Sequence, residues 1–132
     1  NGIYLSDSDE AIRKKVMKAV TDSGPTAPDS PMPEVIANLF TLLRVVSTED
    51  TVQHFTDKWN RCEIRYGDLK KQLAEDIVKV VAPIRARIRD IAADEAYLAR
   101  VVRQGAEKAR ESAGKTLADV REIMGIKPFG LR

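Results

Sequence analysis

Apolar residues recur at helical spacing along most of the chain, and together they predict about five helices. Asp7 followed by Glu10 has the spacing of a capping box, which predicts a first helix that runs to about Val20. The next segment, from Thr21 to Pro33, contains four prolines. Because proline lacks the backbone donor of a helix and disfavours helical backbone before it, this segment is predicted to be a loop.

Two shorter helices are expected next. One starts near Pro33, a residue type suited to a first helical turn, and continues to Val46 with apolar residues around much of its circumference. We expect that helix to lie centrally. Ser47 with Asp50 then predicts a capped third helix through about Trp59, followed by a connector over residues 60–66.

A long fourth helix is predicted from Asp68. Apolar residues recur in it at alternating steps of three and four, and the pattern continues unshifted across Pro83. A proline inside a continuing pattern predicts a kink and not a break. The stripe consists of Leu69, Leu73, Ile77, Val80, Ile84, Ile88 and Ile91.

The last predicted helix is capped by Asp94 and extends to Met124, with Gly125 placed to end it in a left-handed turn. Small residues in the middle of its apolar stripe allow a partner helix to approach closely. The stripe consists of Leu98, Val102, Gly105, Ala109, Ala113, Leu117, Val120 and Met124. The sequence therefore predicts an all-α fold: a single domain over residues 1–132, a helical bundle with two long antiparallel C-terminal helices.

Composition adds few constraints. Among 132 residues, 32% are charged and the net charge is only +2, too small an excess to identify a nucleic-acid partner. A single cysteine excludes an internal disulfide and suits a reducing cytosol, so we expect a cytoplasmic protein. No apolar run has the length of a membrane span, and no membrane role is expected.

No catalytic constellation can be assembled from the sequence. His54 has no neighbouring metal ligand, Cys62 has no histidine partner, and no glycine-rich phosphate loop occurs. Paired carboxylates lie in predicted first helical turns, where the helix dipole accounts for them. We therefore expect no catalytic residue, no metal ligand and no cofactor in this chain. Since it opens with Asn1 and not with Met, we also expect it to be a fragment.

The positive residues leave one anomaly. Lys70 and Lys71 lie in the first turn of a predicted helix, where the helix dipole disfavours cations. A nearby anion such as a tRNA phosphate would remove this conflict.

Five motifs resemble bacterial tryptophanyl-tRNA synthetases, in order and with compatible spacing. "KVMKAVTDS" from Lys15 is similar to the segment that follows the mobile signature loop of those enzymes, and "YGDLKKQL" from Tyr66 to their Tyr-Gly-x-x-Lys motif. The latter leads into Pro-Ile-x-x-Arg at Pro83. "GAEKA" from Gly105 is the strongest match, and Met124 with Gly125 closes the pattern.

This resemblance implies part of a class I aminoacyl-tRNA synthetase that acts as a homodimer. The full enzyme would activate tryptophan with ATP and magnesium and then esterify its tRNA. Both catalytic signatures of the family and its Rossmann domain are absent from this sequence. The chain is thus expected to be the helical anticodon-binding domain, inactive by itself, with tRNA and its own catalytic domain as partners.

The resemblance also implies which residues approach the anticodon. Lys70 matches the first lysine of the family's Leu-Lys-Lys pattern, with Lys71 beside it, and the turn that holds Asp22 and Ser23 matches a loop near the same nucleotides. The connector lacks the Gly-Lys common in relatives, which leaves Arg61 and Arg65 as substitutes. Two alternatives stay open: a helical protein-interaction module using the last two helices, and a fragment that binds tRNA only beside its catalytic domain.

Overall fold

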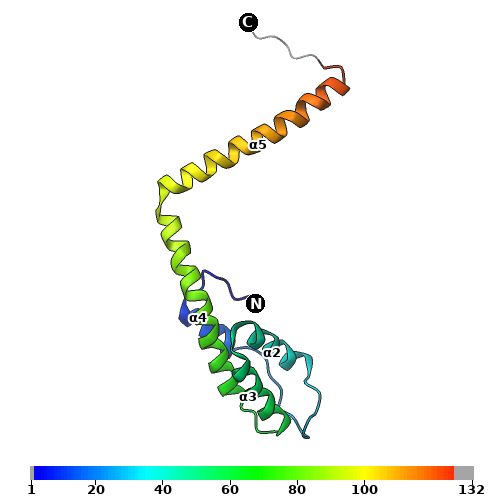
Figure 1. Cartoon of the computed structure of the whole chain (residues 1–132). Helices are drawn as coiled ribbons and strands as arrows, with labels where there is room; N and C mark the ends of the chain where they lie inside the picture. The colour runs from blue at the N-terminus through cyan, green and yellow to red at the C-terminus, as the bar shows by residue number, and fades with distance from the viewer. Residues whose placement is uncertain (1, 127–132) are drawn as a thin grey trace. The chain divides into compact units, whose positions relative to one another are not determined.

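The computed structural model describes residues 2–126, and all the regular structure in that range is α-helical (Figure 1), which confirms the all-α prediction. The five helices are α1 (Asp9–Met17), α2 (Glu34–Val46), α3 (Glu49–Asn60), α4 (Tyr66–Ala93) and α5 (Glu95–Ile123). The chain divides into two compact units, Asn1–Arg87 and Ile88–Arg132. That the two units form a single domain stays a prediction.

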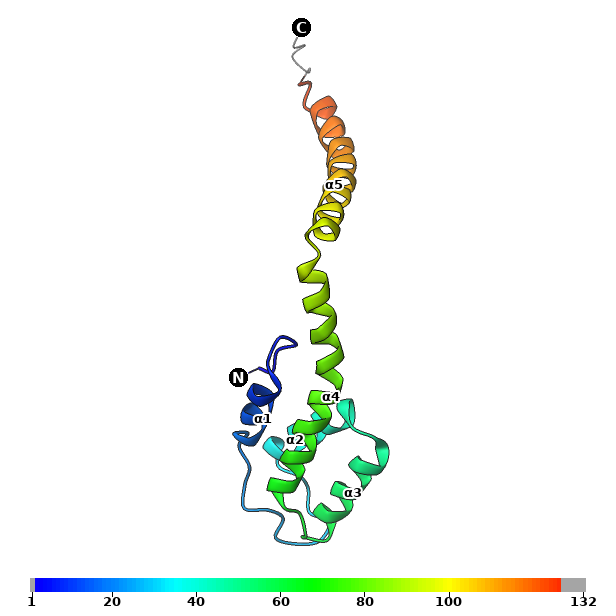
Figure 2. The ribbon, with the colours of Figure 1, turned by 90° about the vertical axis from the view of Figure 1, so that its left-hand side faces the viewer.

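The hydrophobic core lies in the first unit. There α1, α2 and α3 gather around the N-terminal half of α4 (Figure 2), and each contributes its apolar face. The side chains at the centre are fully buried: Ile12 of α1, Ile36, Phe40 and Leu43 of α2, Trp59 of α3, and Leu69 and Leu73 of α4. By contrast, α2 exposes Val35, Leu42 and Val45 on its other side. It is therefore buried on one face only, although its sequence predicted a central position.

The start and end of α1 differ from the prediction. Its N-cap is Ser8, whose Oγ accepts a hydrogen bond from the Ala11 amide at 3.2 Å. Asp7 is occupied elsewhere, because its Oδ2 accepts from the Tyr4 amide at 2.8 Å and from Lys15 Nζ at 2.6 Å. The helix ends at Met17 and not near Val20. Beyond that point the Ala19 carbonyl accepts from the side chain of Lys70 and not from a helical amide.

The corner between α2 and α3 also corrects a predicted cap. Thr48 caps α3 through a hydrogen bond from the Thr51 amide to its Oγ1 at 3.4 Å. The neighbouring Ser47, predicted as the cap, instead donates to Asp76 Oδ2 of α4 at 2.7 Å. Since this bond joins the corner to α4, a tertiary contact decides which of two adjacent hydroxyl residues caps the helix.

The two long helices agree with the sequence in their extent. α4 begins at Tyr66, two residues before the predicted start, and continues through Pro83 without a break; its kink stays a prediction. Asp94 caps α5 by accepting from the Tyr97 amide at 2.8 Å, and Gly125 has the predicted left-handed backbone, with φ of 69°.

The apolar stripe of α5 is exposed. No residue of this helix is buried in the described structure, and Val102 and Leu117 are 69% and 52% exposed. The antiparallel packing of the last two helices therefore stays a prediction. Within residues 2–126, no helix is long and apolar enough to cross a membrane.

Candidate nucleic-acid interface

The loop between α1 and α2 is fastened at its far end to α3. Trp59 Nε1 donates to the Ser30 carbonyl at 2.9 Å, and the Asp29 amide donates to the Asn60 carbonyl at 3.1 Å. Asp29 has φ of 55°, a left-handed conformation that aspartate tolerates better than most residues. These contacts hold the proline-rich loop against the end of α3 shortly before the chain enters α2.

At its near end the same loop forms a tight turn against α4. Asp22 Oδ1 accepts from the Gly24 amide at 2.8 Å, the hydrogen bond of an Asx turn. Gly24 has φ of 98°, which favours glycine at this position. The hydroxyl group of Tyr66, the first residue of α4, donates to the same carboxylate oxygen. The segment Thr21–Gly24, named here the anchored turn, is thus joined directly to α4.

The side chain of Lys70 binds the anchored turn and the segment just before it. Its side chain is buried, with the residue 8% exposed, and Nζ donates to the Ala19 carbonyl at 2.7 Å and to Thr21 Oγ1 at 3.3 Å. Ala19 lies just past the carboxyl end of α1, where the dipole of that helix favours a cation. Because α4 begins at Tyr66, Lys70 is its fifth residue and lies beyond the first turn, so the predicted conflict with the helix dipole is corrected. The contacts with Ala19 and Thr21 account for the burial of this lysine within the chain itself.

Lys71 and Arg65 are placed differently. Successive residues on a helix point about 100° apart, so the chain buries Lys70 while Lys71 stays exposed. Arg65, which directly precedes α4, is exposed as well. Among the residues that the structure describes, neither side chain forms an ion pair. Their charges are available to an external anion.

All five residues predicted to bind tRNA therefore lie in one region. The anchored turn supplies Asp22 and Ser23, both exposed, and the beginning of α4 supplies Lys70, Lys71 and Arg65. Their contact with tRNA stays a prediction. What the sequence did not predict is the burial of Lys70 and the bond between Tyr66 and Asp22. These contacts join residues 51 and 44 positions apart, a separation at which helical periodicity carries no signal. Tyr66 and Lys70 share a face of α4, but this follows only from a helix that starts at Tyr66, and the sequence predicted a start at Asp68.

The hydrogen bonds within the anchored turn keep the Asp22 carboxylate ionised and therefore able to accept further hydrogen bonds. The pKa of Asp22 is lowered by the hydrogen bond from Tyr66 and next by the amide of Gly24, so the carboxylate is ionised at neutral pH. Burial and the same hydrogen bond raise the pKa of Tyr66, which keeps its hydroxyl group a donor. Both bonds fall on Oδ1, so Oδ2 of this exposed carboxylate accepts no hydrogen bond within the described part of the chain.

Other candidate chemistry has structural explanations. The His54 ring is exposed and packs edge-on against Phe55. Cys62 is exposed, with φ of 57°, in the turn that ends α3, where the Glu63 amide donates to the Lys58 carbonyl at 2.8 Å. Within residues 2–126, no group of three or more His, Cys, Asp or Glu side chains could hold a metal ion.

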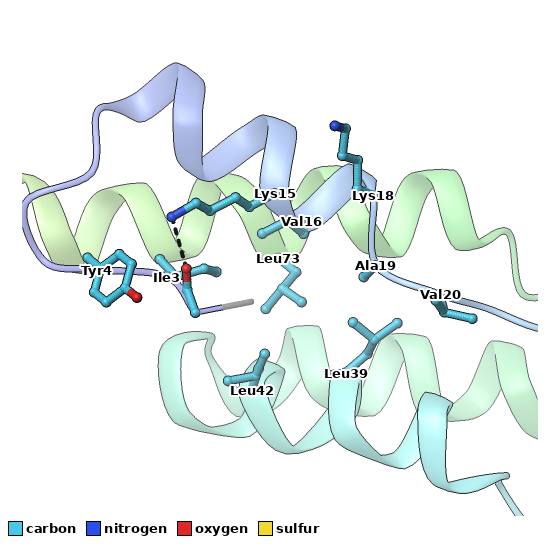
Figure 3. A pocket seen from close by; sticks show the side chains of 11 residues that line it. Ile3, Tyr4, Lys15, Val16, Lys18, Ala19, Val20, Leu39, Leu42 and Leu73 are labelled. Carbon is cyan, nitrogen blue, oxygen red and sulfur yellow. Dashed lines mark hydrogen bonds between the residues drawn. The ribbon is translucent and has the colours of Figure 1, made fainter.

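A separate hollow of about 470 Å³ lies between the N-terminal segment, α1 and α2 (Figure 3). Its walls are mostly apolar and include Ile3, Val16, Leu39 and Leu42. Lys15 Nζ at its rim donates to the Gly2 carbonyl at 2.9 Å. It contains no pair of groups suited to acid–base chemistry.

Comparison with known proteins gives consistent relatives. The chain is 61% identical over 127 residues to a tryptophan–tRNA ligase of Porphyromonas gingivalis, an overlap of 96% of this chain and 39% of that protein. It is 38% identical to tryptophan–tRNA ligase 1 of Streptomyces coelicolor and 36% identical to the enzyme of Helicobacter pylori, again over 96% of this chain. The chain spans only 36 to 39% of the length of these curated relatives. No solved structure matches it.

A model of the family described as tRNA synthetases class I (W and Y) matches residues 1–82. That segment contains α1, α2, α3, the anchored turn and the first part of α4, so it includes the whole candidate interface. Because the match covers well over half of the 132 residues, the chain belongs to the class I tRNA synthetases of the tryptophan and tyrosine type.

Proposed function

We propose that this chain is the tRNA-binding part of a tryptophan–tRNA ligase and that it holds the anticodon end of the tRNA. The observation that carries the proposal is the 61% identity to a tryptophan–tRNA ligase across 96% of the chain. The complete enzyme would activate tryptophan with ATP and magnesium and transfer it to the tRNA specific for tryptophan, acting as a homodimer. We assign no residue of this chain to ATP, magnesium or tryptophan.

The arrangement at the start of α4 supports a division of labour in tRNA binding. Lys71 and Arg65 are exposed cations suited to phosphate groups, which supply affinity but little sequence information. Asp22 and Ser23 in the anchored turn present side-chain oxygens to base edges. A carboxylate accepts from an exocyclic amino group such as that of cytosine, and splayed bases in a single-stranded loop expose these groups.

The proposed substrate is tested by assaying the full-length protein that contains this chain. It should esterify tRNA with tryptophan in the presence of ATP and magnesium, and tyrosine should be a poor substitute. Tyrosine is the informative control, because the family includes enzymes for both amino acids. Efficient charging with tyrosine, or with neither amino acid, would contradict the proposed function.

A second candidate function is a helical protein-interaction module. It is favoured by the exposed apolar stripe of α5, which includes Val102 and Leu117. Salt dependence separates the two candidates, because tRNA affinity that rests on phosphate contacts falls steeply as salt is added. A partner held by apolar contacts would bind with little dependence on salt. The tests use the full-length protein, since loss of a second contact weakens a linked interaction strongly.

A further inference from the structure

We propose that Lys70 and Tyr66 are positioning residues, which fix the shape of the anchored turn and thereby set which anticodon base is accepted, without touching the tRNA themselves. This inference rests on the proposed function and deepens it. It assigns specificity to the anchored turn and its two supports, and it assigns sequence-independent affinity to Lys71 and Arg65.

The first argument is geometric. Tyr66 and Lys70 are four residues apart on α4, so their side chains emerge one above the other on the same face of the helix. Between them they bind three of the four residues from Ala19 to Asp22: Lys70 binds the Ala19 carbonyl and the Thr21 hydroxyl group, and Tyr66 binds the Asp22 carboxylate. Two neighbouring supports on a rigid helix thus determine both the position of the turn and the orientation of Asp22.

The second argument concerns the cost of burying a charge. Lys70 is 8% exposed, and within the described residues it forms no ion pair, so its hydrogen-bond acceptors there are a neutral carbonyl and a neutral hydroxyl group. Removing a cation from water without a carboxylate partner is unfavourable. A methionine at this position would fill similar space without that cost, so packing alone does not explain the lysine. Its hydrogen bonds to Ala19 and Thr21, beside the carboxyl end of α1, do explain it, and methionine could not make them.

The third argument is the contrast with the next residue. Lys71 has the same chemistry but is exposed, and it forms no ion pair among the described residues. Adjacent lysines, one buried under the turn and one open to solvent, are therefore expected to act in different ways. Replacing each of them with methionine gives a matched pair of variants.

The experiment measures the affinity of the full-length protein for the tRNA specific for tryptophan and for a copy with one anticodon base replaced, at several salt concentrations. Lys70→Met should reduce the ratio of the two affinities by about fivefold or more, near the low end of what one misread base costs. Its salt dependence should match that of the unaltered protein. Lys71→Met should lower both affinities alike, and the slope of log affinity against log salt should become shallower by about one.

Tyr66→Phe provides a second variant, because it removes only the hydroxyl group that binds Asp22 and keeps the packed ring. It should also reduce the ratio of affinities and leave the salt slope unchanged. A variant that merely loses folded protein would bind both tRNAs less and keep their ratio.

The inference is overturned if Lys70→Met and Tyr66→Phe both keep the ratio, or if Lys70→Met changes the salt slope as Lys71→Met does. The latter result would make Lys70 a direct phosphate contact. If the unaltered protein binds neither tRNA, the proposed function itself fails, and that outcome is distinct from either of the others.

Discussion

Asp76 shows how one buried carboxylate organises its surroundings in this fold. It is 6% exposed and accepts hydrogen bonds from Ser47 Oγ at 2.7 Å, from Gln72 Nε2 at 3.0 Å and from Lys79 Nζ at 3.1 Å. Burial raises the pKa of Asp76, but the hydrogen bonds from Gln72, Ser47 and Lys79 outweigh burial and hold the pKa below its ordinary value of 3.8. The group is therefore ionised at neutral pH and joins α4 to the corner before α3.

Replacing Asp76 with asparagine should lower the free energy of unfolding at pH 7 by about 1–3 kcal/mol, because buried partners lose a charged acceptor. Since the folded pKa lies below the unfolded one, this contribution is complete above the unfolded pKa and is lost as pH falls through the folded pKa. The difference between the two proteins should therefore shrink below about pH 4. Urea unfolding at pH 7 and pH 3 measures it, with the exposed Asp119→Asn as control. A difference that stays constant with pH would refute this account of Asp76.

Lys71 offers a residue-scale test of phosphate binding. Lys71→Ala in the full-length protein should weaken tRNA binding about equally for all tRNA sequences and reduce the salt slope by about one, because a single phosphate contact is lost. Lys14→Ala removes the same charge from an exposed position on α1 and should leave the slope unchanged. Equal effects of the two substitutions would show that only overall charge matters.

At the scale of elements, the packing of α2 can be tested with two adjacent leucines. Leu43 is fully buried and Leu42 is 45% exposed on the same helix. Leu43→Ala should lower the free energy of unfolding by about 2–5 kcal/mol, because it leaves a cavity in the core. Leu42→Ala should change it by about 0.5 kcal/mol or less. Chemical denaturation of both variants checks this, and similar losses for the two would mean that the face of α2 is assigned incorrectly.

Periodicity predicted which elements form, and tertiary contacts decided where they end. The apolar pattern located each helix, and Asp94 and Gly125 mark the ends of α5 where the sequence placed them. Asp7 and Ser47 were mistaken for caps because each stands beside another good capping residue. Ser47 instead binds Asp76, 29 residues away on α4, and Asp7 binds the Tyr4 amide and Lys15, eight residues further along the chain. The spacing of a capping box reports neither set of contacts.

For the whole molecule, the sequence located the candidate interface but not its division of roles. Resemblance selected Asp22, Ser23, Arg65, Lys70 and Lys71, and the structure brings them into one region. The structure also shows that Lys70 is buried and Lys71 is exposed. This difference arises because the loop after α1 packs against α4 at Lys70, a contact that the sequence does not reveal. The net charge of +2 cannot reveal such an interface, because a few exposed cations are enough for it.

The central claim, that this chain holds the anticodon end of tRNA, is tested most directly by footprinting the tRNA specific for tryptophan on the full-length protein. Hydroxyl radicals should cleave the anticodon loop less when the protein is bound. The double variant Arg65→Ala with Lys71→Ala should lose that protection while protection of the acceptor end remains. An anticodon loop that stays exposed with the unaltered protein, or that stays protected with the double variant, would contradict the account.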